Sequence, residues 1–262
     1  MTATQTPRKG RRRLYLYWDW DGSVVKTDHE VHRPSWNWAA TQILLERDVC
    51  LDAVEWDKIQ TAAFGLPEPL AAEVMAMKIK EHHPEAFNGD GVDPEVLSRL
   101  RMQYLTEKWD APYGDISLID GVGQALELAH RNLIVTSSCA LVVAWMAQKL
   151  GVQDRFPHDF WITAEHPALL PDRLWKPKLN PWQLAKEKVE ATEGDLHIPI
   201  EDSVVMAVEL STCRLFDYIY LVVHDDAQME DRHMELQRNS VDLDKVRVVR
   251  DLRPLVQFMQ AH

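Results

Sequence analysis

The sequence predicts an α/β protein in which a Rossmann-like, doubly wound parallel sheet carries an inserted all-helical cap domain. Three observations predict this architecture. The apolar, aromatic run that begins at Leu14 ends in two carboxylates and a glycine. The block from about residue 35 to 108 shows only helical spacing of apolar residues, and from about residue 121 onward short strands alternate with helices. Repeated βα units are typical of a parallel sheet with helices on both faces.

We therefore expect a core formed by residues 14–32 and 114–262, a helical cap at 33–113 and a disordered basic tail at 1–13. The tail contains five basic residues: Arg8, Lys9, Arg11, Arg12 and Arg13. The alternative for such a segment is a nuclear-localisation or polyanion-binding role, including docking on an acidic partner.

The composition excludes several classes of protein. The chain has 262 residues, 46% of them hydrophobic, and no apolar stretch approaches the roughly 18 residues of a membrane-spanning helix. The formal net charge is −12, and because the tail holds five basic and no acidic residues, the remainder is near −17. Such a charge repels nucleic acid, so neither nucleic acid nor a membrane is an expected partner. Three cysteines without metal-ligand spacing favour a reducing, cytoplasmic location. A monomer and a homodimer both remain open.

Apolar residues three and four positions apart predict the cap helices. We expect one helix around Trp38–Leu45, a second at Pro69–His83 and a third from Pro94 to Trp109, with a loop at Asn88–Gly91. No strand candidate occurs in this block.

The second half of the chain is predicted to alternate between the two kinds of element. The expected strands are 133–135, 160–162, 197–200, 218–223 and 246–249, and the expected helices are 121–131, 141–150, 181–189, 204–210 and 252–259.

Two carboxylates follow the first predicted strand, and they form the first candidate site. Asp19 and Asp21 are one residue apart, and in an extended chain residues i and i+2 point the same way, so both can share one metal or one substrate. Gly22 then permits a sharp turn. Open α/β sheets bind ligands at the carboxyl ends of their strands. The alternative is a β-hairpin turn, for which Asp-Gly is a common signal.

Three later segments place polar groups at other strand ends: Thr136-Ser137-Ser138, Lys176 between Trp175 and Pro177, and Glu201-Asp202-Ser203. Each alone has a plain alternative, namely a helix cap, a surface lysine and solvated acids. Together with Asp19 and Asp21, these segments supply two acid pairs, a hydroxyl and an ammonium at one edge of a sheet. This set suits phosphoryl transfer, because carboxylate oxygens bind Mg²⁺ and a lysine offsets the charge of the transferred group.

With these segments in this order, the chain resembles the haloacid dehalogenase-like (HAD) superfamily, in particular its phosphatase and phosphoglucomutase-like members with a helical cap between the first and second motifs. Asp19-Trp20-Asp21-Gly22 matches the first motif and Thr136 the second. Lys176-Pro177 matches the third motif, and Glu201-Asp202-Ser203 the fourth. The resemblance covers about residues 14–258.

The resemblance implies a role for each group. Asp19 would be the nucleophile that forms an aspartyl-phosphate, and Asp21 the general acid and then the base. Thr136 would bind phosphoryl oxygens and Lys176 would hold the nucleophile and the phosphoryl group together. Mg²⁺ would be the cofactor, and its implied ligands are Asp19, Asp21 through its backbone carbonyl, Glu201 and Asp202.

The substrate is less well defined by the sequence. Ser137, His29, Arg33 and Gly65 are the candidate substrate-binding residues, and Gly65 lies in a Phe64–Pro67 segment that resembles the cap turn facing the site in relatives. Further candidates are Lys26, His32, Met77 and Lys78. Two departures from the family pattern, a missing glycine around 211–215 and a longer loop at 164–175, leave the substrate class open.

The expected function is a Mg²⁺-dependent phosphatase acting on a small phosphorylated metabolite, such as a sugar phosphate or nucleoside monophosphate, through an aspartyl-phosphate. Family dehalogenases lack the second aspartate, so the presence of Asp21 favours phosphate esters. One alternative is a phosphomutase that uses the same residues, and another is a non-catalytic binding protein on this fold.

Overall fold

A computed structural model describes residues 12–27, 31–51, 54–61, 63, 66–88, 90–108 and 116–262. Residues 1–11 of the expected tail, His29 and Gly65 lie outside the described residues. No helix in the described part of the chain is both long enough and apolar enough to cross a membrane.

The centre of the structure is a sheet of six strands within the described residues, and every pairing is parallel. The strands are β1 (Leu14–Trp18), β2 (Arg131–Val135), β3 (Trp161–Ile162), β4 (Leu196–Glu201), β5 (Ile219–Val222) and β6 (Val246–Val249). Their order is β3-β2-β1-β4-β5-β6, so the most apolar strand, β1, lies between β2 and β4. The carboxyl ends of β1, β2 and β4 therefore meet at one edge of the sheet.

Helices cover both faces of the sheet, as the alternation of β1 requires. Leu14, Leu16 and Trp18 pack in a core with α6 (Val122–Leu128), α7 (Ala140–Lys149) and α11 (Arg253–Ala261). Tyr15 and Tyr17 point to the opposite face. That face is covered by α8 (Asn180–Glu187), α9 (Val204–Thr212) and α10 (Asp226–Arg238). The fold is thus the Rossmann-like, doubly wound α/β sheet that the sequence predicts.

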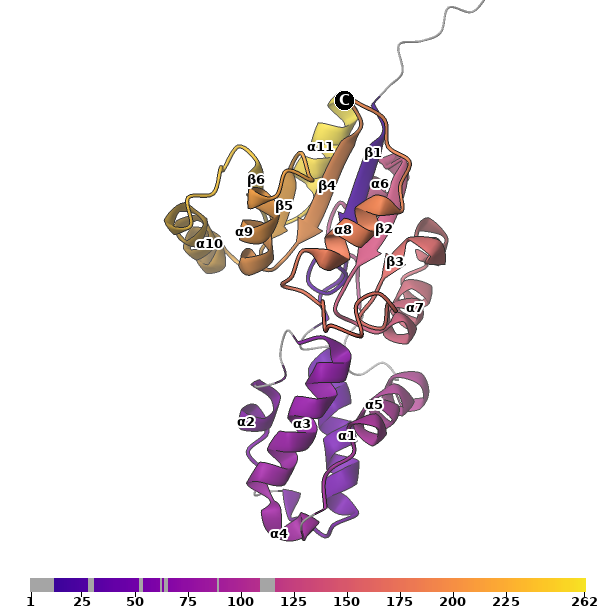
Figure 1. Ribbon diagram of the computed structural model, residues 1–262, viewed down its shortest axis with the longest axis vertical. Helices are drawn as coiled ribbons and strands as arrows, with labels where there is room; N and C mark the ends of the chain where they lie inside the picture. The colour runs from indigo at the N-terminus through magenta and orange to yellow at the C-terminus, as the bar shows by residue number, and fades with distance from the viewer. Residues whose placement is uncertain are drawn as a thin grey trace, which may run out of the picture.

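The block after β1 is helical, and it forms a separate layer below the sheet in Figure 1. Its helices are α1 (Arg33–Leu45), α2 (Trp56–Thr61), α3 (Glu68–His82), α4 (Pro84–Phe87) and α5 (Pro94–Gln103), followed by a π-helical turn at Tyr104–Lys108. They enclose a core of their own that includes Leu44, Met75, Ile79 and Leu97. We refer to this helical layer as the cap.

Several element boundaries differ from the sequence predictions. The helix predicted at 121–131 ends at Leu128, because β2 already begins at Arg131. The helix predicted to reach Trp109 ends at Gln103 and continues as the π-helical turn, and Trp109 lies outside the described residues. Three helices, α2, α4 and α10, are additional to those predicted.

The predicted tail is wrong at its last residue. Arg13 belongs to the folded body, because its backbone N–H donates to Asp195 Oδ1 at 3.1 Å and its guanidinium lies 2.7 Å from Asp195 Oδ2. The guanidinium also donates to the Glu190 carbonyl and to Thr192 Oγ1. These contacts hold the start of β1 against the loop before β4.

His197 is buried on the face of the sheet that carries Tyr15 and Tyr17, and we expect it to make the stability of the protein depend on pH. Burial raises the pKa of Tyr17, so its hydroxyl stays protonated, and it forms a hydrogen bond with Nδ1 of His197 at 2.7 Å. Burial, then the nearby Lys186 ammonium, lowers the pKa of His197 to about 4. The unfolded chain binds a proton at His197 below pH about 6.5, whereas the folded chain does so only near pH 4.

His197 therefore contributes stability that is present above pH about 6.5 and lost as the pH falls towards 4. We expect this residue to account for a loss of about 2 kcal/mol in unfolding free energy between pH 7 and pH 5. Urea unfolding of wild type and His197→Asn at both pH values measures it, since the Asn oxygen can still accept from Tyr17. An equal loss in the variant would refute the assignment.

Candidate active site

A pocket of about 850 Å³ lies where the predicted strand ends meet, between the sheet and the cap. The polar residues that line it come from the ends of β1, β2 and β4 and from the loop before α8. They are Asp19, Asp21, Thr136, Ser137, Ser138, Lys176, Glu201 and Asp202. All four sequence segments singled out for phosphoryl transfer therefore contribute to one cavity.

A buried lysine joins two of the acids. Lys176 Nζ donates to Asp19 Oδ1 at 2.6 Å and to Glu201 Oε1 at 2.5 Å, and all three side chains are shielded from solvent. Burial alone would lower the pKa of Lys176, but Asp19 and Glu201 raise it above its usual value, so the lysine is cationic. The second Glu201 oxygen accepts from the backbone N–H groups of Asp202 and Ser203. Glu201 is therefore fully engaged within the protein.

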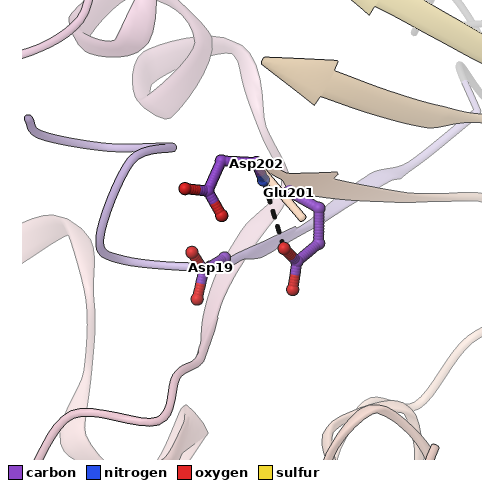
Figure 2. Close-up of side chains that lie close together, drawn as sticks. All are labelled: Asp19, Glu201 and Asp202. Carbon is purple, nitrogen blue, oxygen red and sulfur yellow. Dashed lines mark hydrogen bonds between the residues drawn. The ribbon is translucent and has the colours of Figure 1, made fainter. Parts of the chain in front are cut away.

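Asp19, Glu201 and Asp202 form an acidic cluster, which is the one candidate metal-binding group among the described residues. One oxygen from each lies within 4.8 Å of the others. Figure 2 shows the Asp19 and Asp202 carboxylates facing each other from the ends of β1 and β4. Gly22 makes this approach possible, because a Cβ at this position would overlap the Asp202 carboxylate, and its φ of 80° disfavours other residues.

The charge of this cluster is not balanced by the protein. Burial and the neighbouring Glu201 and Asp202 raise the pKa of Asp19 well above its usual range, although Lys176 opposes the shift. Enclosure in the pocket and the Glu201 carboxylate raise the pKa of Asp202 to about 7. The cluster thus favours an additional positive charge beside Asp19 and Asp202.

Asp21 occupies a different part of the pocket. Its Oδ1 accepts hydrogen bonds from Thr27 Oγ1 at 2.6 Å and His32 Nε2 at 2.7 Å, and its Oδ2 accepts from Ser138 Oγ at 2.5 Å. Burial alone would raise the pKa of Asp21, but His32, Ser138 and Thr27 hold it well below its usual range. Asp21 is therefore ionised in this arrangement.

The side chains of Asp19 and Asp21 do not lie in one acidic cluster, whereas the alternative expectation that they share one substrate stays a prediction. Strand β1 ends at Trp18, so the alternation of an extended chain does not apply to the two acids. The Asp21 carboxylate is directed to Thr27, His32 and Ser138 and is not a member of the acidic cluster.

The loop after β2 lies beside both acids. Thr136 is buried, its backbone N–H donates to the Ile162 carbonyl, and its Oγ1 accepts from the Ser138 N–H at 3.1 Å. Ser137 lines the pocket, and its carbonyl accepts from the Glu68 N–H of the cap at 3.1 Å. We call residues 136–139 the β2 loop. It combines hydroxyl and backbone donors suited to a phosphoryl group.

The predicted substrate-binding residues have different outcomes. Arg33 lines the pocket, as do the further candidates Lys26 and His32. His29 and Gly65 cannot be assessed, because they lie outside the described residues. Two candidates lie away from the pocket on α3: the Met77 side chain is exposed, and Lys78 pairs with Glu81 at 2.7 Å.

Sequence reasoning missed several pocket residues. Thr27, Glu68 and Arg101 line the cavity, as does a group after β5 that comprises His224, Asp225, Gln228 and Arg232. Arg101 and Glu68 did give a sequence signal, since each is a charged residue at a position of the apolar stripe of its helix. A charge at such a position must be paired when it is buried.

Comparisons with known proteins agree with this architecture. No protein-family model and no curated protein matches the chain. Solved structures do match over nearly the whole chain, and they show that it has the haloacid dehalogenase-like fold with a helical cap.

Three of these structures illustrate the range of proteins that share this fold. A HAD-hydrolase of Bacillus subtilis, YfnB, solved with bound magnesium, is 14% identical with a TM-score of 0.59, covering 95% of this chain and 99% of its own. A predicted phosphoglycolate phosphatase of Haemophilus somnus is 12% identical with a TM-score of 0.58, covering 94% and 97%. The L-2-haloacid dehalogenase of Xanthobacter autotrophicus is 13% identical with a TM-score of 0.55, covering 96% and 99%. The shared fold therefore includes both phosphatases and dehalogenases.

Proposed function

We propose that this protein is a Mg²⁺-dependent phosphatase of the HAD superfamily that hydrolyses a small phosphorylated metabolite through an aspartyl-phosphate on Asp19. The observation that carries the proposal is the second carboxylate, Asp21. It lies in the same pocket as Asp19, is separate from the acidic cluster, and is held by three hydrogen bonds. A carboxylic acid in this position can give a proton to a leaving alkoxide. Displacement of a halide requires no such proton.

The donor set fits Mg²⁺, which prefers carboxylate and carbonyl oxygens. Asp19 and Asp202 face each other, and burial with the neighbouring carboxylates raises the pKa of both, so a cation between them would stabilise their ionised forms. Asp19, Asp202 and the Asp21 carbonyl would hold the ion. Glu201 would have to give up a contact to Lys176 or to a backbone N–H to bind directly, so it serves better to hold Lys176. The bound ion would supply positive charge beside the phosphoryl group.

The chain's own residues then account for two half-reactions. An Asp19 oxygen attacks phosphorus, the bond from phosphorus to the leaving oxygen breaks, and Asp21 gives its proton to that oxygen. Because Asp21 is ionised in the arrangement described above, it would take up this proton from solvent as the phosphate dianion binds beside it. In the second step the ionised Asp21 takes a proton from water, which attacks the aspartyl-phosphate and regenerates Asp19. Lys176 holds Asp19 throughout, and Thr136 and the β2 loop donate to the phosphoryl oxygens.

The test is phosphate release from a panel of ribose 5-phosphate, glucose 6-phosphate, phosphoglycolate, AMP and acetyl phosphate, with Mg²⁺ or EDTA. We expect metal-dependent release from at least one alkyl phosphate. Isomerised product without phosphate would instead indicate a phosphomutase. Release of chloride from 2-chloropropionate, without release of phosphate, would contradict the proposal.

Asp202→Asn is expected to raise the Mg²⁺ concentration needed for half-maximal activity by at least about tenfold, because even outer-shell changes typically cost about 10–100-fold in metal affinity. Asp225→Asn is the matched control. Asp225 lines the same pocket but caps α10 by accepting from the Gln228 N–H, which Asn does equally well. A Mg²⁺ titration that gave the same midpoint for both variants would remove Asp202 from the metal site.

A further inference from the structure

A buried ion pair in the cap lies at the pocket and has no role in the mechanism above. Arg101 of α5 and Glu68 of α3 are 2% and 7% exposed, and Arg101 Nη1 lies 2.6 Å from Glu68 Oε2. Burying two charges is costly, and apolar residues of the same volume often pack as stably. The other hydrogen bonds of Arg101 and Glu68 therefore indicate what the buried pair does.

Each of the three nitrogens of the Arg101 side chain has a partner. Nη2 donates to His32 Nδ1 at 2.7 Å, Nε donates to Ser35 Oγ at 3.2 Å, and the guanidinium lies 4.6 Å from the centre of the Trp36 ring. The planar guanidinium fork of Arg101 is thus fixed between helices α1, α3 and α5 and the segment before α1 that contains His32.

Arg101 determines which nitrogen of His32 has the proton. A guanidinium can only donate, so Nδ1 of His32 must accept and the proton is on Nε2. Nε2 then donates to Asp21 Oδ1 at 2.7 Å. Asp21 favours the same tautomer, so without Arg101 this single contact would have to hold His32 in it.

Glu68 connects the same pair to the core. Its Oε2 accepts from the Cys139 N–H at 3.4 Å, and its N–H donates to the Ser137 carbonyl. The β2 loop in turn reaches Asp21, because Ser138 Oγ donates to Asp21 Oδ2 at 2.5 Å. A closed ring of contacts therefore runs from Asp21 through His32 and the cap pair to the β2 loop and back.

We propose that Arg101 is a positioning residue for the reaction: it holds His32 in the tautomer that orients Asp21, and through Glu68 it makes that orientation depend on the cap being seated on the β2 loop. Arg101 and Glu68 belong to the cap, whereas Asp21 and Cys139 belong to the core. The orientation of Asp21 is thereby tied to the contact between the cap and the β2 loop. This inference rests on the proposed function, in which Asp21 exchanges that proton.

The test compares two leaving groups in single-turnover phosphorylation of the enzyme. Acetate leaves acetyl phosphate without a proton, whereas an alkoxide needs one from Asp21. Arg101→Lys keeps a charge for Glu68, but a single ammonium does not reproduce the fork. We expect Arg101→Lys to be phosphorylated about 10–100-fold more slowly by the alkyl phosphate that reacts fastest with wild type. The reason is that a misoriented Asp21 loses part of its general-acid effect. Phosphorylation by acetyl phosphate should change less than about threefold.

Arg173→Gln is the control for cap docking alone. Arg173 of the core forms an ion pair with Glu73 of α3 in the cap, at 3.1 Å. Both side chains are exposed, and neither belongs to the ring of contacts. We expect the ratio of the two rates to be unchanged in this variant. If Arg173→Gln shifted the ratio as Arg101→Lys does, cap seating in general would explain the effect and the role of Arg101 would be refuted.

Two further outcomes are distinguishable. Equal loss with both substrates in Arg101→Lys would overturn the inference while leaving the proposed function intact. No phosphorylation of wild type by any substrate would instead refute the proposed function. Should Arg101→Lys fail to fold, Glu68→Met with Arg101→Met removes both buried charges together, which proteins tolerate better than loss of one. The same change in the rate ratio is expected for this double variant.

Discussion

Asp19→Asn is expected to abolish turnover while the protein stays folded. The substitution keeps the size of the side chain but removes the oxygen nucleophile, and loss of such a group costs at least about 10⁴-fold in kcat. The other acids beside it have other roles: Glu201 is engaged by Lys176 and two N–H groups, Asp21 is held by three donors, and Asp202 is assigned to the metal.

The stability of this variant is an informative control. Asp19 is buried beside Glu201 and Asp202, and its raised pKa reflects the cost of its charge. Lys176 keeps Glu201 as a partner. We therefore expect a Tm equal to or above that of wild type in metal-free buffer. Near-normal phosphate release by a folded Asp19→Asn protein would contradict the assigned nucleophile.

Asp21→Asn is expected to separate the two half-reactions. Asn can still accept from Thr27 and His32, but it neither gives nor takes a proton, so turnover of alkyl phosphates should fall by about 10²–10⁴-fold. Acetyl phosphate should still phosphorylate Asp19, because acetate leaves without a proton. Hydrolysis of the aspartyl-phosphate would then be slow, since no base activates the water.

The measurement is a rapid-mixing assay with acetyl phosphate. We expect a burst of acetate equal to one per active site, and a protein heavier by one phosphoryl group in intact-mass spectra. Asp19→Asn in the same assay should give no burst and no added mass. Steady turnover of Asp21→Asn at the wild-type rate, with no accumulated phosphoenzyme, would show that Asp21 is not the acid–base group.

The parts of the site that the sequence could predict are those set by the sheet. Apolar runs identify β1, β2 and β4, and parallel strands must end at the same edge, so the residues after them had to meet. The strand ends at Trp18, Val135 and Glu201 confirm this reasoning. Which way each acid points depends on where a strand stops, and because β1 stops at Trp18, the Asp21 side chain lies outside the acidic cluster.

The parts that could not be predicted depend on contacts between distant residues. Arg101 lies in the apolar stripe between Leu97 and Tyr104, and only its partner Glu68, far away in the sequence, makes that position tolerable. Helix α10 escaped prediction for a different reason. This helix is almost entirely polar. Leu236 is a buried side chain that packs it against the core, and one such residue does not produce a recognisable apolar periodicity.

The most direct test of the central claim is phosphate release from the panel by wild type and Asp19→Asn, each with Mg²⁺ and with EDTA. The account predicts release from at least one alkyl phosphate by wild type with Mg²⁺, and none with EDTA or with the variant. Release that persists in Asp19→Asn, or that does not depend on the metal, would contradict it.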